Sequence, residues 1–297
     1  HTPVTSVDTS SEALAVSMGE KAYVDMEYMC QLSGKTEEEI YSDLKGVIFL
    51  NPMYGYGNST EAKYLMADEY LSGNVREKLA WAKRSAELSP DDYKIHVEAL
   101  EKVQPKDLTA SEISVRLGAT WLPPEIVEQF IFEFLGTPRY AQWNIKLHFS
   151  QYTGEWNLEG KSYDRGNVKA YNTYGTSRIN AYKIIEETLN LKDVRIFDYI
   201  EEPDGKKKAV LNKKETAIAQ SKQELIKQGF QDWIWADPER RERLCKLYNE
   251  KFNSIRPREY DGSHITFNGM NPEIELREHQ KNAVAHILYG GNTLLAH

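Results

Sequence analysis

The stretch TEEEIYSDLKGVIFL, residues 36–50, contains the start of a helix, its end and the beginning of a strand. Thr36 and Glu39 have the Thr-x-x-Glu spacing of a capping box, in which each side chain bonds the backbone N–H of the other residue. Ile40 and Leu44 lie four residues apart, so they share one face of this helix. A glycine then ends the helix, and a short apolar run follows. The stretch therefore predicts a helix that leads directly into a strand.

Helices are also predicted before this stretch, and a second strand is predicted after it. Residues 10–20 and 23–32 have apolar side chains at helical spacing, and a Ser-Gly pair closes the second helix. The apolar runs 47–50 and 64–66 are separated by a loop rich in glycine, asparagine and tyrosine, which is typical of a hairpin. Helix, tight turn, helix and hairpin together predict a winged helix-turn-helix over residues 22–72.

The second helix of this predicted unit is strongly acidic. It holds Glu37, Glu38, Glu39 and Asp43. A helix that reads DNA must approach phosphates, and a row of carboxylates repels them. The charge therefore favours a protein rather than DNA as the partner of this unit.

Four segments account for the whole chain. Residues 1–72 hold the possible winged helix, and residues 73–138 read as a helical spacer made of an antiparallel helix pair and a further buried helix. Residues 139–212 predict an α+β unit with a hairpin, and residues 213–297 predict a helical region. The expected fold class is α+β and mainly helical, with a mixed middle and a helical last third.

The middle segment contains two predicted strand pairs. Apolar residues alternate from Trp143 to Leu158 across Thr153-Gly154, which is typical of a β-hairpin. A strand at residues 194–200 has a possible partner at residues 208–211 across Pro203-Asp204-Gly205.

Composition limits the classes of protein to which the chain could belong. At 297 residues it is long enough for two or three compact units, and it has no run of about 18 apolar residues that could cross a membrane. Its opening residues do not resemble a secretory signal. Cys30 and Cys245 are too few for a disulfide framework, so we expect buried thiols and a cytoplasmic protein. The net charge of -8 means that any contact with nucleic acid must be local.

No catalytic motif is present in the sequence. It lacks a GxSxG elbow, an HExxH pair, paired CxxC motifs and a complete GxxxxGK[ST] loop. His279 and His286 lie one heptad apart but have no third ligand nearby, so no metal site is predicted. The chain itself is expected not to be catalytic and to hold no cofactor. An unrecognised enzyme is the third hypothesis, and it is disfavoured because the sequence shows no group of polar residues that would meet in one catalytic site.

Lysines and arginines gather in the last third of the chain and predict contacts with DNA phosphates. The first cluster is opposed in the same stretch by Asp204, Glu215 and Glu224. Such runs can also be solvated faces of helices. The DNA-binding candidates are Lys206, Lys207, Lys208, Lys213, Lys214, Lys222, Lys227, Arg240, Arg241, Arg243, Arg256 and Arg258.

The C-terminal stretch, LREHQKNAVAHILYGGNTLLAH, has the order of elements that leads to a nucleotide site. It predicts an amphipathic helix carrying Arg277 and Gln280, a break at Gly290-Gly291 and an apolar strand at residues 293–296. A P-loop NTPase needs such a strand to deliver a glycine loop to a helix, whose backbone N–H groups bind phosphate. The strand is predicted here, and the loop would come next.

This stretch resembles a known family. The spacing Leu-Arg-x-x-Gln-x-x-Ala-Val at residues 276–284, followed by Thr-Leu-Leu-Ala-His, resembles the start of the first motor domain of superfamily two helicases of the Swi/Snf type. Upstream stretches resemble the large adenine-specific DNA methylase and Swi/Snf-type helicase proteins of bacterial mobile elements and phages. They are VDMEYMCQLSG, ADEYLSGNVREKL, ISVRLGATWLPPEIVEQF, TYGTSRINA and REYDGSHITFNGMNPEIELREHQ.

The resemblance covers essentially the whole chain and implies a place for it between methylase and motor, ending just before the Walker A loop. It also implies that Gln280, helped by Arg277, contacts the adenine of ATP, and that ATP and Mg²⁺ belong to the parent protein. The two residues could equally be an exposed polar pair on an amphipathic helix.

The resulting hypothesis is a non-catalytic accessory region that positions DNA and couples the flanking methylase and helicase modules, with no membrane contact. The alternative is a protein-interaction or structural scaffold without DNA affinity.

Overall fold

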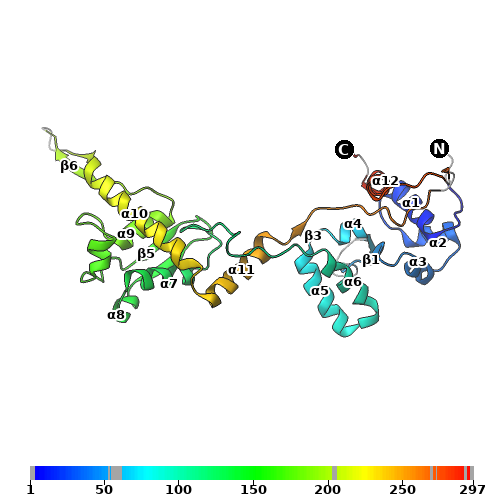
Figure 1. Ribbon diagram of the computed structural model, residues 1–297, viewed down its shortest axis with the longest axis horizontal. Coiled ribbons are helices and arrows are strands. Elements are labelled where there is room, and N and C mark those ends of the chain that lie inside the picture. Colours follow the sequence, from blue (N-terminus) through cyan, green and yellow to red (C-terminus); the bar gives the residue numbers. More distant parts are fainter. Residues whose placement is uncertain are drawn as a thin grey trace. The chain divides into compact units, whose positions relative to one another are not determined.

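Helices provide most of the regular structure in the computed structural model, which describes residues 4–52, 54, 62–202, 206–267, 270–271, 273–290 and 293–294. The chain forms two compact units, which we call unit 1 (His1–Lys106 with Phe252–His297) and unit 2 (Asp107–Lys251) (Figure 1). Small two-stranded sheets accompany the helices in both units. The fold class is α+β and mainly helical, as the sequence predicts.

Unit 1 begins with three helices followed by a hairpin. These elements are α1 (Ser10–Lys21), α2 (Met26–Ser33), α3 (Glu37–Asp43), β1 (Ile48–Leu50) and β2 (Tyr64–Met66). The predicted capping box at the start of α3 is present, with Thr36 and Glu39 each bonding the backbone N–H of the other. β1 and β2 pair antiparallel, with Phe49 opposite Leu65. The order of elements is that of the predicted winged helix, although most of the loop predicted at 51–60 lies outside the described residues.

A helix pair packs beside this hairpin and has its own buried cluster. It follows the short helix α4 (Ala67–Tyr70) and consists of α5 (Val75–Leu88) and α6 (Pro90–Lys102). The ring of Phe49 stacks on that of Tyr70 at 4.7 Å, and His96 meets both rings edge-on. The predicted antiparallel pair is therefore present, and it shares a core with β1.

The C-terminal part of unit 1 contains a short strand and a helix among its described residues. The predicted linker at 253–272 contains β8 (Ile255–Arg256), which pairs antiparallel with β3 (Gly73–Asn74). The last helix, α12, spans Glu278–Gly290. Of the strand predicted at 293–296, Thr293 and Leu294 have no strand structure, and the other two residues lie outside the described residues.

Unit 2 combines helices with two hairpins. Its elements are α7 (Pro124–Leu135), α8 (Arg139–Gln142), β4 (Lys146–Phe149), β5 (Trp156–Glu159), the π-helix η1 (Lys169–Thr173), α9 (Ala181–Leu189), β6 (Phe197–Glu201), β7 (Lys207–Leu211), α10 (Lys213–Ile234) and α11 (Pro238–Phe252). β4 pairs with β5, and β6 pairs with β7, each pair antiparallel. Both strand pairs match the predicted ones.

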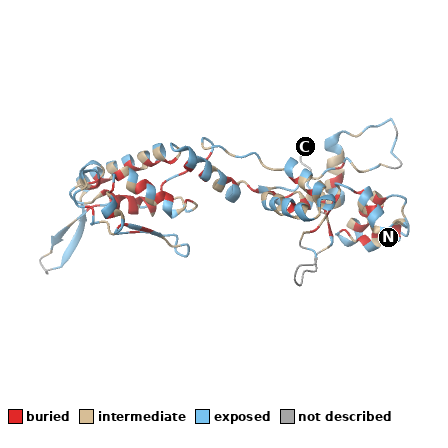
Figure 2. Ribbon diagram, turned by 90° about the horizontal axis from the view of Figure 1, so that it is seen from below, coloured by how far each residue is buried: buried red, intermediate tan, exposed pale blue. Residues whose placement is uncertain are grey.

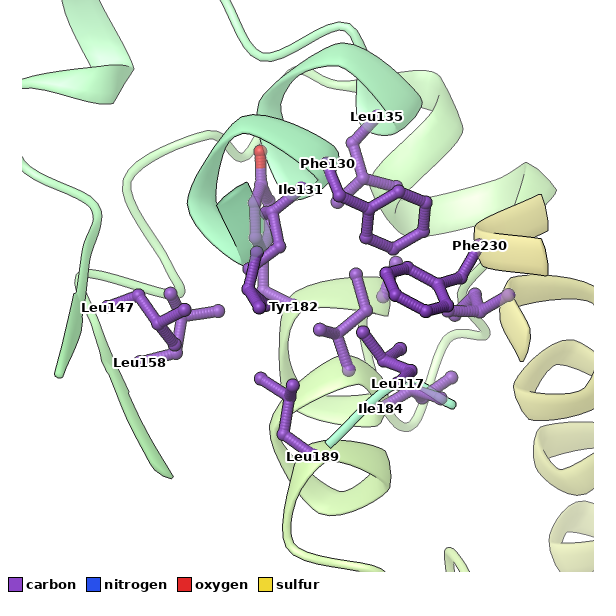
Figure 3. Packing of buried hydrophobic residues seen from close by; sticks show 14 of the residues in the cluster. Leu117, Phe130, Ile131, Leu135, Leu147, Leu158, Tyr182, Ile184, Leu189 and Phe230 are labelled. Atoms are coloured by element: carbon purple, nitrogen blue, oxygen red, sulfur yellow. The ribbon is translucent and has the colours of Figure 1, made fainter. Parts of the chain in front are cut away.

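The hydrophobic core of unit 2 lies between α7, α9, α10 and the β4–β5 hairpin (Figure 3). Phe130 of α7 meets Phe230 of α10 edge-on, with ring centroids 5.1 Å apart. Position 229, next to Phe230, requires a glycine, because a Cβ there would lie 2.2 Å from the ring of Phe134. The broad apolar stripe that the sequence shows on α7 is thus buried, as predicted.

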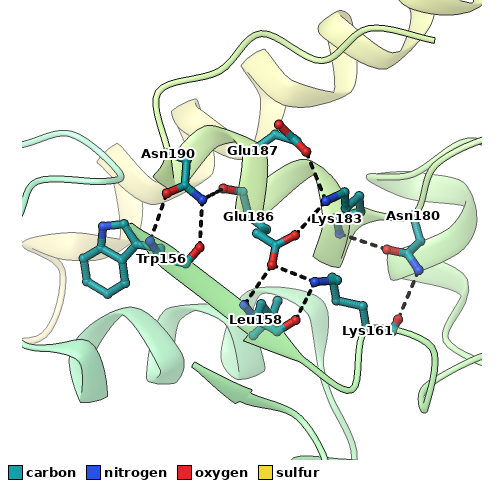
Figure 4. A network of polar contacts seen from close by, with 8 residues as sticks. All are labelled: Trp156, Leu158, Lys161, Asn180, Lys183, Glu186, Glu187 and Asn190. Carbon is teal, nitrogen blue, oxygen red and sulfur yellow. Dashed lines mark hydrogen bonds and ion pairs between the residues drawn. The ribbon is translucent and has the colours of Figure 1, made fainter. Parts of the chain in front are cut away.

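A buried carboxylate joins α9 to the β5 strand of this unit (Figure 4). Glu186 accepts the Leu158 backbone N–H at 2.9 Å and the ammonium groups of Lys161 and Lys183 at 2.6 and 2.8 Å. Burial alone would raise the pKa of Glu186, but these bonds outweigh it and hold that pKa below its usual value. Asn190 adds two bonds to the backbone of Trp156.

Two expectations about single residues are wrong. The alternation that starts at Trp143 becomes a strand only at Lys146, because the chain makes one turn of helix after Pro138 and Trp143 ends that turn. Ala141 is the buried residue of α8, and Trp143 is exposed. Cys30 and Cys245 are half-buried rather than buried, although burial still raises the pKa of both thiols.

Candidate nucleic-acid interface

Charge is divided unequally between the two units. Unit 1 contains 15 lysines and arginines against 23 aspartates and glutamates, whereas unit 2 contains 22 of each kind. The whole net charge of -8 therefore belongs to unit 1. A polyanion such as DNA is repelled less by unit 2 than by unit 1.

Three of the predicted DNA contacts lie on or beside the β6–β7 hairpin, which we call the arm. Its strands are exposed on both faces, as Figure 2 shows, and Lys206, Lys207 and Lys208 are among its exposed residues. Lys207 lies opposite Glu201 in the register, and Lys208 forms an ion pair of 3.3 Å with Glu202. The strand pairing thus places acids of β6 against the lysines of β7.

This pairing reduces the positive charge that the sequence suggests for the arm. Residues 194–216 hold six lysines and arginines and five aspartates and glutamates. Along the chain, the acids of β6 precede the lysines of β7 by several residues. Only the antiparallel register brings the two groups together.

The α10 helix carries four of the predicted contacts in two different settings. Lys213 and Lys214 are exposed in its first turn, which Asn212 caps through the Glu215 backbone N–H. Lys222 instead donates to the Thr173 carbonyl at 2.8 Å, and Lys227 pairs with Glu224 at 2.6 Å. The start of α10 is therefore the part of this helix best placed for phosphate.

Arg240 has a role inside the protein. It is buried, its guanidinium donates to the carbonyls of Ile234 and Trp233 at 3.0 and 2.6 Å, and its charge lies 3.5 Å from the Trp233 ring centroid. Burial lowers its pKa. Arg241 is exposed and bonds the Trp235 carbonyl. Arg240 is therefore unavailable to phosphate, and we leave it out of the proposed interface.

The other predicted arginines are also engaged. Arg243 pairs with Glu125 of α7 at 2.7 Å on the surface of unit 2. In unit 1, Arg256 donates to the Leu71 carbonyl and pairs with Glu259. Arg258 lies within 4 Å of carboxylates of α4. These contacts hold the 253–260 stretch in place, and none of them points to DNA.

Two of the four acids of α3, Glu37 and Asp43, form ion pairs within unit 1. Glu37 accepts from Lys63 and the Tyr64 hydroxyl at 2.6 and 2.7 Å, and these bonds lower its pKa. Asp43 pairs with Lys35 at 2.6 Å. The helix has no lysine or arginine of its own. It therefore offers no phosphate contact of the kind that a DNA-reading helix makes.

Arg277 and Gln280 lie at the exposed start of α12. The Gln280 side-chain oxygen accepts the Arg277 backbone N–H at 2.9 Å, so it helps to cap the helix. This bond uses the side-chain oxygen of Gln280 and does not involve its amide N–H groups. The amphipathic-helix interpretation and the adenine-contact interpretation are both compatible with this position.

The other end of α12 docks on the winged helix. Ala285 is fully buried, and Tyr289 packs against the hydrophobic cluster of α1, α2 and α3. The Tyr289 hydroxyl lies 3.1 Å from Nε2 of His264, and burial raises the pKa of Tyr289 to about 12. Gly262 lies directly on α12, where a Cβ would be 2.0 Å from the Lys281 carbonyl oxygen.

A cleft of about 790 Å³ lies beside this docking site, between α4, the Tyr260–His264 stretch and α12. It contains Asp68, whose pKa is raised by burial although Arg258 opposes the rise. The described residues contain no group of three side chains that could hold a metal ion. The cleft is also lined by His264, which bonds Tyr289, and by Asp43 and Glu259, which pair with Lys35 and Arg256. These groups are already engaged within unit 1, which gives the enzyme hypothesis little support.

Two family models match the chain. Residues 6–61 match a probable helicase, winged helix domain, and residues 116–254 match a domain of unknown function (DUF8437). The N-terminal part of the chain is therefore similar to a winged helix of probable helicases, which supports a helicase-associated region. Its match covers the helices and first strand predicted from the sequence. No curated protein and no solved structure matches the chain. Among the described residues, no helix is both long and apolar enough to span a membrane.

Proposed function

We propose that this chain is the accessory and connecting region of a DNA methylase fused to a Swi/Snf-type helicase, and that it positions DNA and couples the two modules. The match to a helicase winged helix supports a helicase context. The methylase, the Swi/Snf type and the mobile-element origin rest on the resemblance of the sequence alone. ATP and Mg²⁺ would belong to the motor that follows.

The docking of α12 on the winged helix carries this proposal. In the helicases that the C-terminal stretch resembles, the helix with the Arg-x-x-Gln spacing is the first element of the motor. Here Ala285 and Tyr289 of that helix pack in unit 1 with α1. A motor attached to this helix would therefore transmit force or movement to the winged helix. Gln280 stays exposed at the opposite end, where it could face a nucleotide.

Unit 2 is the proposed DNA-contacting part. It is neutral overall, and Lys207, Lys213 and Lys214 are exposed near one another in the chain, with Lys206 and Lys208 beside them. Several clustered cations bind duplex phosphates by releasing counterions, without reading the sequence. A contact of this kind would orient DNA without specifying a site.

Hydrogen exchange of the intact chain tests the coupling. Tyr289→Ala removes a packed side chain from the end of α12, and Ile287→Ala removes a comparably large side chain that is exposed. We expect the first change to speed amide exchange in α12 and α1 about tenfold, corresponding to about 1.4 kcal/mol, and the second to leave it nearly unchanged. Equal exchange in the two variants, or an α12 that is already unprotected in the parent chain, would contradict the coupling.

A protein scaffold without DNA affinity is the second candidate. It is favoured by the acidic charge of unit 1 and by an α3 helix that lacks lysine and arginine. Exposed Tyr199 and Ile200 on the arm also suit a protein partner. The two candidates differ in one observable, because the scaffold predicts no salt-dependent binding of duplex DNA.

A further inference from the structure

Unit 2 exposes three large aromatic side chains in one region of its surface. Tyr140 is 69% exposed, Trp143 is 80% exposed and Tyr163 is 63% exposed. The core of the unit is complete without them. A single exposed ring is ordinary on a protein surface, but exposed rings grouped on adjoining segments are typical of a binding surface.

The backbone segments that carry these three rings lie close together. Tyr140 and Trp143 are three residues apart on the α8 turn, so they share one side of it. The loop with Tyr163 is packed against the end of that turn, because a Cβ on Gly160 would lie 2.0 Å from the Asn144 carbonyl oxygen. The Tyr163 backbone N–H donates to the Gly160 carbonyl at 2.9 Å, which fixes the loop.

Gly160 is the residue that permits this approach. Its φ of +70° is a left-handed conformation that other residues rarely adopt, and no side chain fits between the two segments. Asn180 bonds the carbonyl of Lys161 at 3.1 Å, so the loop is also tied to the start of α9. The aromatic group is thus built on a fixed backbone.

Four exposed cations lie on the segments that carry the rings or next to them. Arg139, Lys146, Arg165 and Lys169 are exposed, and none forms an ion pair with any residue in the described part of the chain. Lys169 lies beside Gly136, close to the start of α8. Lys146 resembles the lysines of the arm, because an acid lies opposite it across the hairpin, whereas the other three cations lie outside the strands.

Few acids offset these cations. Glu159 lies opposite Lys146 in the β4–β5 register, and its carboxylate is 3.7 Å from His148. Asp164 is buried and accepts bonds from the Tyr182 hydroxyl and the Asn167 amide at 2.7 and 2.6 Å. Its charge therefore lies inside the unit. Residues 139–170 hold five lysines and arginines against three aspartates and glutamates, so this stretch carries a small excess of positive charge.

We infer that Tyr140, Trp143 and Tyr163, with the unpaired cations around them, form a binding site for single-stranded DNA. Unpaired bases stack on exposed aromatic rings, and cations beside the rings bind the phosphates between the bases. Duplex DNA cannot use such rings, because its bases are already stacked within the helix. The inference rests on the proposed function for its nucleic-acid context, but it concerns a different surface and a different form of DNA.

Fluorescence anisotropy of the intact chain with a labelled oligothymidine of about 16 nucleotides tests the site, since that length matches the larger sites known for such surfaces. We expect Trp143→Ala to weaken binding about 10-fold, from the loss of one stacked base, and Trp143→Phe to retain most of the affinity. Tyr140→Ala and Tyr163→Ala should each weaken binding several-fold.

Tyr152→Ala is the matched control, because Tyr152 is fully exposed at the β4–β5 turn of the same unit and lies outside the proposed site. We expect it to bind like the parent chain. Lys146→Gln should lower the salt dependence of binding by about 0.7 in the slope of log K against log salt. All these residues are exposed, so thermal unfolding should be unchanged, which separates lost binding from lost folding.

Unchanged oligothymidine affinity in Trp143→Ala, or an equal loss in Tyr152→Ala, would overturn the inference. Absence of any oligothymidine binding would overturn it as well. The proposed function has its own readouts, the exchange of α12 and the binding of duplex DNA. If those hold while Trp143→Ala has no effect, the single-strand site fails alone. If duplex binding and α12 docking fail while Trp143 still matters, the proposed function fails alone.

Discussion

Replacing Arg240 by alanine should destabilise unit 2 strongly, whereas the same change at Arg241, its neighbour on α11, should not. The Arg240 guanidinium makes two hydrogen bonds to backbone carbonyls and lies over the ring of Trp233. Hydrogen bonds from a charged group contribute about 1.5–3 kcal/mol each, and a partly desolvated cation–π contact contributes about 1–2 kcal/mol. The cost of burying the charge offsets part of this sum, so we expect a loss of about 3 kcal/mol.

Thermal unfolding followed by circular dichroism measures this difference. For a unit of this size, about 3 kcal/mol corresponds to a fall in Tm of about 6–12 °C. Arg241 is exposed, so Arg241→Ala should change Tm by about 2 °C or less. The reasoning would be refuted if Arg240→Ala unfolded like the parent chain but lost duplex DNA binding, because Arg240 would then contact DNA.

Three further predictions concern other parts of the chain. Burial lowers the pKa of His96 from 6.5 to about 4, so the imidazole is protonated in the unfolded chain at a higher pH than in the folded chain. The free energy of unfolding of unit 1 should therefore fall by about 2 kcal/mol between about pH 7.5 and 5. Urea unfolding at several pH values should show this fall, and His96→Phe should abolish it. Glu186→Gln leaves Lys161 and Lys183 without their shared carboxylate and should lower the free energy of unfolding of unit 2 by about 3 kcal/mol. Glu187→Gln, at a more exposed position, should lower it by under about 1 kcal/mol. Gly160→Ala should move the Tyr163 loop and reduce oligothymidine affinity more than it reduces duplex affinity, as anisotropy with both probes would reveal.

Local patterns predicted most of the elements correctly. The sequence signals for these elements come from residues close together in the chain. They include the capping box of Thr36 and Glu39, the apolar stripe of α7 and the strand pair predicted at 194–200 and 208–211, which forms at 197–201 and 207–211. Such signals depend on backbone hydrogen bonding and side-chain periodicity, which act over a few residues. They needed no knowledge of tertiary contacts.

The surface assignments depended on contacts that local patterns do not contain. The sequence predicts an exposed cation at Arg240. The contacts of its guanidinium with the Trp233 carbonyl and ring become visible only in the folded structure. The lysines of the arm lose part of their charge to Glu201 and Glu202 through strand register. Trp143 continues an alternating pattern yet ends a helical turn on the surface. A close approach such as that of Gly160 to Asn144 leaves no periodic signal.

Binding of labelled duplex DNA to the intact chain, measured by anisotropy at about 50 and 200 mM salt, tests the proposed DNA-positioning role most directly. We predict binding that weakens steeply with salt and a slope of log K against log salt that falls by about 2 when Lys213 and Lys214 are both changed to glutamine. Lys83→Gln in unit 1, whose lysine pairs with Glu101, should leave the slope unchanged. Duplex binding that is absent at both salt concentrations, or insensitive to Lys213 and Lys214, would contradict the role and favour the scaffold.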